Sequence, residues 1–75
     1  MIAEIKQYLE RPSRSGKRCH IEKIAGTKDN IEKKVLNYID ERMNNKAFIR
    51  VIEFKVVIKS GKYTAYDWTY KPTYR

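Results

Sequence analysis

The chain has 75 residues, one of them a cysteine, and a formal net charge of +8. This length gives one domain with a small core, which disfavours an enzyme with a deep cleft, and a lone cysteine excludes an intrachain disulfide. Because no stretch resembles a signal peptide or approaches the roughly 20 apolar residues of a membrane span, we expect a cytoplasmic, non-enzymatic protein with no catalytic residue, metal, cofactor or membrane partner.

Residues 1–10 fit two patterns. Their apolar positions match both a helical stripe and the alternation of a strand. Residues 11–17 contain Pro, Ser and Gly and indicate a loop. A short alternating strand follows from Cys19 and stops at Gly26. These segments predict a β-hairpin, with helix–loop–strand as the alternative.

The clearest predicted element is a helix that closes at Asn44 and Asn45. Its apolar residues recur with helical spacing: Ile31, Val35, Tyr38, Ile39 and Met43. Either Thr27 or Asp29 can cap the first turn, and Asp29 with Glu32 has the spacing of a capping box. Residues 27–45 hold four bases and four acids, so this helix has no net charge.

A second hairpin is predicted in the C-terminal third. A long strand covers residues 47–59, Ser60 and Gly61 form the turn, and a second strand runs from Tyr63 to Tyr70. Alternation places one apolar set of the first strand toward the core: Phe48, Ile52, Phe54, Val56 and Ile58.

The register of this hairpin follows from its turn. A three-residue loop ending at Gly61, which accepts a left-handed conformation, pairs Phe54 with Tyr66. The same register pairs Ile52 with Trp68. It therefore predicts that Tyr66 and Trp68 belong to the core. It also places Tyr70 at the edge, beside Arg50.

Together these elements predict one small α+β domain over residues 1–70, in the order ββαββ. The expected architecture is a four-stranded, largely antiparallel sheet with one helix packed on one face. Residues 71–75 are expected to form a flexible basic and aromatic tail.

Two local patterns resemble parts of catalytic sites. Cys19 and His20 are adjacent in a strand and point to opposite faces, so they cannot share a proton; a buried thiol beside an exposed imidazole is expected. Glu53-Phe54-Lys55 resembles the Glu-x-Lys of the PD-(D/E)xK nucleases, which implies metal-dependent phosphodiester cleavage with Asp67 as the nearest second carboxylate. No Pro-Asp pair precedes it, and a charged sheet face explains the residues equally well.

The excess positive charge is concentrated in two segments. Residues 11–18 sum to +4 and residues 46–75 to +5. Aromatic residues alternate with the bases in the second segment, a combination typical of surfaces that bind nucleic acid. We therefore predict a non-enzymatic nucleic-acid-binding module that contacts phosphates, with Tyr63 or Tyr70 stacking on bases. The predicted contact residues are Arg11, Arg14, Lys17, Arg18, Lys59, Lys62, Tyr63, Tyr70 and Lys71.

The alternative prediction is a small protein-interaction module, an inhibitor or adaptor of the kind that mobile elements encode. It would dock an acidic partner surface. The sheet face without a helix supports this, because alternation places Ile49, Val51 and Val57 there. A homodimer through that face or through a sheet edge is a further alternative.

Overall fold

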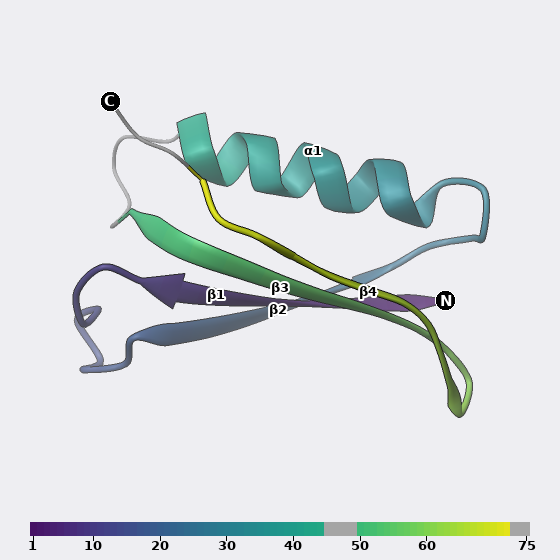
Figure 1. The fold of residues 1–75 in the computed structure, drawn as a ribbon, viewed down its shortest axis with the longest axis horizontal. Helices are drawn as coiled ribbons and strands as arrows, with labels where there is room; N and C mark the ends of the chain where they lie inside the picture. Colours follow the sequence, from purple (N-terminus) through teal and green to yellow (C-terminus); the bar gives the residue numbers. More distant parts are fainter. Residues whose placement is uncertain (45–49, 73–75) are drawn as a thin grey trace.

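The computed structural model describes residues 1–44 and 50–72 and shows the predicted ββαββ order (Figure 1). Its elements are β1 (Ile2–Leu9), β2 (Cys19–Ala25), α1 (Ile31–Asn44), β3 (Val51–Ser60) and β4 (Tyr63–Tyr70). The strands form one antiparallel sheet in the order β2-β1-β3-β4. The helix covers one face of this sheet and comes closest to β1 and β2. The α+β fold is therefore confirmed, and the segment 1–10 contains a strand, Ile2–Leu9, and not a helix.

The chain enters α1 through a turn that starts at Thr27. Asn30 Oδ1 accepts a hydrogen bond from the Thr27 N–H at 2.8 Å, and the Thr27 carbonyl accepts one from the Ile31 N–H at 2.9 Å. A side chain that reaches back three residues to a backbone N–H is one half of a capping box. The structure thus uses Thr27 with Asn30, rather than the predicted pair of Asp29 and Glu32.

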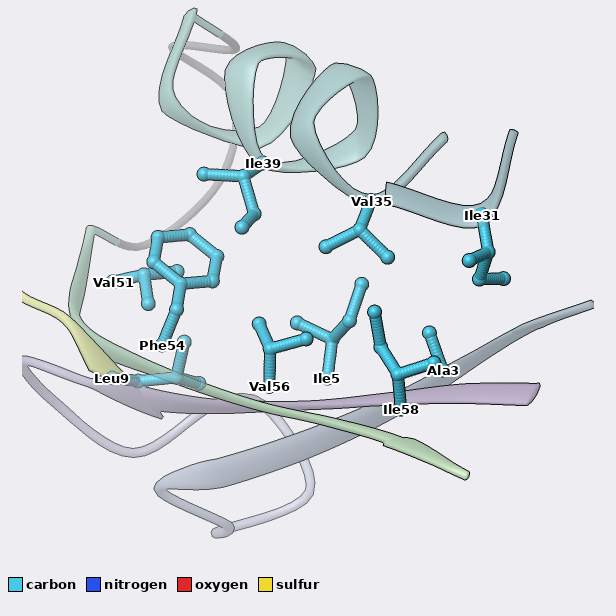
Figure 2. Packing of buried hydrophobic residues seen from close by; sticks show 10 residues of the cluster. All are labelled: Ala3, Ile5, Leu9, Ile31, Val35, Ile39, Val51, Phe54, Val56 and Ile58. Atoms are coloured by element: carbon cyan, nitrogen blue, oxygen red, sulfur yellow. The ribbon is translucent and has the colours of Figure 1, made fainter. Parts of the chain in front are cut away.

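The core lies between α1 and the sheet (Figure 2). The helix contributes Ile31, Val35 and Ile39. The strands contribute Ala3, Ile5, Leu9, Val51, Phe54, Val56 and Ile58. Tyr38 and Met43 pack at the border of this cluster, which confirms the predicted helical stripe. The predicted core residue Phe48 lies outside the described residues.

One predicted core position in β3 is wrong, namely Ile52. Tyr8 lies opposite Glu53, but the next residue, Leu9, lies opposite Val51. The extra residue on β3 is a β-bulge, which reverses the alternation of faces in the residues before it. Val51 is therefore 3% exposed and belongs to the core, whereas Ile52 is 51% exposed.

The turn of the second hairpin also differs from the prediction. Ser60 pairs with Tyr63 across the two residues Gly61 and Lys62, and Gly61 has the predicted positive φ, at 61°. A glycine with positive φ at the first of two loop residues fits a type II′ turn. The predicted three-residue loop and the register built on it are wrong.

A second bulge nevertheless preserves the predicted faces of β4. Between Thr64 and Tyr66 the pairing with β3 shifts by one residue. Phe54 was predicted to pair with Tyr66, but the different turn and this bulge together pair it with Tyr70. The shift is 70 − 66 = 4 residues. An even shift leaves every side chain on its face. Tyr66, Trp68 and Tyr70 therefore lie on the helix side of the sheet, as predicted.

Gln7 is a polar residue buried inside this core, with an exposed fraction of 0%. Its Nε2 donates a hydrogen bond to Tyr38 Oη at 2.8 Å, and its Oε1 accepts one from Arg42 Nε at 2.9 Å. Both partners belong to α1. The pair of bonds therefore fixes the position of the helix along β1, because a shifted helix would leave a buried amide unsatisfied.

We expect Tyr38→Phe to lower the free energy of unfolding by about 1–3 kcal/mol, because it removes the acceptor of a buried donor. Urea unfolding of the variant measures this loss. The double variant Gln7→Leu/Tyr38→Phe should lose less stability than the sum of the two single variants, because both single variants break the same bond between Gln7 and Tyr38. Equal stability of Tyr38→Phe and the unmodified chain would show that the bond contributes nothing.

Candidate nucleic-acid interface

The predicted contact residues do not form one patch. The loop between β1 and β2 lies at one end of the sheet and the turn between β3 and β4 at the other (Figure 1). The eight residues of β1 separate the two ends by about 24 Å. At the loop end lie Arg11, Arg14, Lys17, Arg18, Tyr70 and Lys71. At the turn end lie Lys59, Lys62 and Tyr63.

The loop over residues 10–18, here called the basic loop, has a hydrogen-bonded backbone. The Ser13 carbonyl accepts from the Gly16 N–H at 2.8 Å, and the Ser13 N–H donates to the Lys17 carbonyl at 2.9 Å. Gly16 has a positive φ of 80°, which its lack of a Cβ permits. The four basic side chains of the loop are exposed. A folded loop therefore holds four cations outward from a defined backbone.

Arg50 adjoins the basic loop and was not among the predicted contact residues. Its carbonyl accepts a hydrogen bond from the Glu10 N–H at 3.0 Å, and Arg50 is exposed. No local pattern could show this neighbourhood, because it depends on the pairing of β1 with β3. Lys71 lies at the same end, with its Nζ 3.8 Å from Glu53 Oε1 and 74% of its side chain exposed. We call the basic loop, Arg50 and Lys71 the basic end.

The helix-side face of β4 carries three aromatic residues, here called the aromatic row: Tyr66, Trp68 and Tyr70. Trp68 packs against the core, and the Tyr70 ring lies 6.3 Å from that of Phe54. Tyr66 is 49% exposed and Tyr70 is 40% exposed. The predicted core position of Tyr66 is therefore wrong. The physical reason is that α1 comes closest to β1 and β2 and lies away from β4, the edge strand.

The opposite face of the sheet has no helix over it among the described residues. Of the apolar residues predicted there, Val57 is half-buried, Val51 points into the core because of the bulge, and Ile49 lies outside the described residues. Ile2 and Ile21 are instead exposed on this face, at 53% and 47%. We call this the open face.

The two patterns that suggested catalysis lie apart from each other. Cys19 pairs with Tyr8 and His20 with Gln7, so their side chains point to opposite faces as predicted. The cysteine is half-buried rather than buried, and the exposed His20 Nε2 lies 3.5 Å from Glu22 Oε2.

Glu53 and Lys55 do share the open face, as their spacing predicts, and Asp67 lies on the same face opposite Val57. Glu53, however, contacts Lys71. Within residues 1–44 and 50–72, no three His, Cys, Asp or Glu side chains gather in a way that could hold a metal ion. The geometry therefore adds nothing to the resemblance to the nucleases.

Comparisons of the chain with protein-family models, with curated proteins and with solved structures found no match. In the part of the chain that the structure describes, no helix has the length and apolar character needed to cross a membrane. The candidate interface is therefore supported by the geometry and charge of this chain alone.

Proposed function

We propose that this chain is a non-enzymatic, cytoplasmic nucleic-acid-binding module whose basic end contacts phosphates. The observation that carries the proposal is the basic loop, where four exposed cations stand on a hydrogen-bonded backbone. Arg50 and Lys71 extend this positive surface along the end of the sheet. Arginine suits such a site, because its guanidinium donates two parallel hydrogen bonds to phosphate oxygens.

The arrangement supports binding that depends little on sequence. Contacts to phosphates position a protein on nucleic acid but do not distinguish bases. The described helix residues include acids as well as bases, so α1 is a poor candidate for a helix that reads the major groove. The loops and strand ends would make the contacts, and the helix would support them from behind.

A salt series tests the proposal. Binding of the chain to unrelated DNA and RNA is measured by fluorescence anisotropy between about 50 and 200 mM salt. Each phosphate contact should contribute about 0.7–0.9 to the slope of log affinity against log salt. We expect a slope of at least about 3, from the four cations of the loop. Absence of binding at the lowest salt concentration would refute the proposal.

One observation favours the second candidate function, a module that docks an acidic protein surface. Lys6 lies directly opposite Lys55 on the open face, next to the exposed Ile21. Two like charges in a cross-strand pair are destabilising, and an acidic partner would relieve that repulsion while covering the apolar side chain. Lys6→Glu should abolish such an interaction in a pull-down and leave nucleic-acid binding unchanged.

A further inference from the structure

We infer that the nucleic acid is single-stranded and that its bases cover the aromatic row of β4; this inference rests on the proposed function. The row combines partial burial with exposed ring surface: Trp68 packs on the core, while Tyr66 and Tyr70 keep 49% and 40% of their surface exposed. In a duplex the faces of the bases are stacked on one another. Only a single strand can present them to protein rings.

The spacing of the row suits this ligand. Alternate residues of a strand lie about 6.8 Å apart, which is twice the about 3.4 Å between stacked bases of one strand. A strand with splayed bases can therefore place one base on each ring. At the turn end the row is continued by Tyr63, which is 81% exposed and follows Lys62.

The aromatic row lies between the two groups of predicted contact residues. It follows β4 from the turn end, near Lys62, to the basic end, near Lys71. A ligand that bridges the two groups must cover the intervening strand. A single strand along β4 runs from Lys62 at the turn end to Lys71 at the basic end. The basic loop joins β1 and β2 on the other side of β3, so nucleotides that continue past Lys71 across the end of the sheet would reach its cations.

The backbone of β4 adds a contact for the phosphates. Among residues 1–44 and 50–72 the strand is at the edge of the sheet and pairs with β3 along one side. Its outer side therefore presents N–H groups that β3 does not satisfy. Backbone N–H groups are common donors to phosphate oxygens. The nucleic acid can therefore follow a single path along β4, with its bases over the aromatic rings and its phosphates along the outer edge of the sheet.

Trp68 is the single tryptophan of the chain and reports on this surface directly. The full chain is titrated with a single-stranded oligonucleotide of about ten nucleotides, as DNA and as RNA, and with the duplex of the same sequence, at equal salt. We expect tighter binding of the single strand and quenching of Trp68 fluorescence. Tyr66→Leu should weaken single-strand binding about tenfold, whereas Tyr66→Phe, which keeps the ring, should bind normally.

The outcomes separate this inference from the proposed function. Equal affinity for single strand and duplex, with unchanged Trp68 emission, would overturn the inference and leave the proposed function in place. No binding of either form at low salt would overturn both. Circular dichroism shows whether Tyr66→Leu is folded; if it is not, quenching of Trp68 in the unmodified chain decides the matter.

Discussion

Replacing Arg11, Arg14 and Arg18 together by Gln is expected to weaken nucleic-acid binding about 100- to 500-fold at 0.1 M salt. Each lost phosphate contact removes about 0.7–0.9 from the salt slope, and hence nearly one tenfold step in affinity at that concentration. The three side chains are exposed, so the fold should be unaffected. Anisotropy titrations across the salt series measure both the affinity and the slope, which should fall by about 2–3.

The chain offers a matched control for this variant. Lys23, Lys28 and Lys33 are also exposed and lie toward the other end of the molecule, in β2, in the turn that follows it and in the first turn of α1. Their replacement by Gln lowers the net charge by the same amount, 8 − 3 = +5. We expect a clearly smaller loss of affinity. Equal losses in both variants would show that overall charge, and not the basic end, attracts the ligand.

Phe54→Ala is expected to remove a large part of the stability of the domain. Phe54 is 0% exposed and lies in the core where β3 faces Ile39 of α1 (Figure 2). Truncation of a buried phenylalanine costs about 3–5 kcal/mol. A domain of 75 residues has a total free energy of unfolding of about 4–11 kcal/mol. Thermal and urea unfolding, followed by circular dichroism, measure the loss.

Ile52→Ala is the control, two residues away in the same strand. Simple alternation would place both side chains in the core, whereas the bulge exposes Ile52. We expect its replacement to cost about 0.5 kcal/mol or less. A cost close to that of Phe54→Ala would mean that β3 has no bulge and that Ile52 is buried.

The order of the elements was predictable because each element has a local signal. The helix has its 3.6-residue stripe, the hairpins have Gly61 and the segment 11–17, and alternation marks the strands. The strand order was not predictable, since it depends on contacts between β1 and β3, which are far apart in the sequence. The bulges at Ile52 and before Tyr66 were not predictable either, because they arise from how two particular strands fit together.

The candidate site was predictable in its residue types but not in its arrangement. Charge and aromatic content pointed to the basic loop and to β4 without any structural information. Whether an aromatic residue of β4 is buried depends on which strands the helix covers. The apolar stripe of the helix shows which of its faces is buried, but not which strands it packs on. Tyr66 was therefore misplaced, and Arg50 was missed because its neighbour Glu10 comes from the other end of the sequence.

Because β1 and β3 are the two central strands, the sheet is complete only after they have paired. Each hairpin can form within its own segment, but the sheet closes only when residues 2–9 meet residues 51–59. Such non-local pairing makes folding slower than that of small helical bundles, whose contacts are mostly local. During synthesis β1 has no partner on that side until β3 has emerged from the ribosome. In this interval the unpaired side of β1 and its apolar residues Ala3, Ile5 and Leu9 are open to pairing with other chains, which leads to aggregation.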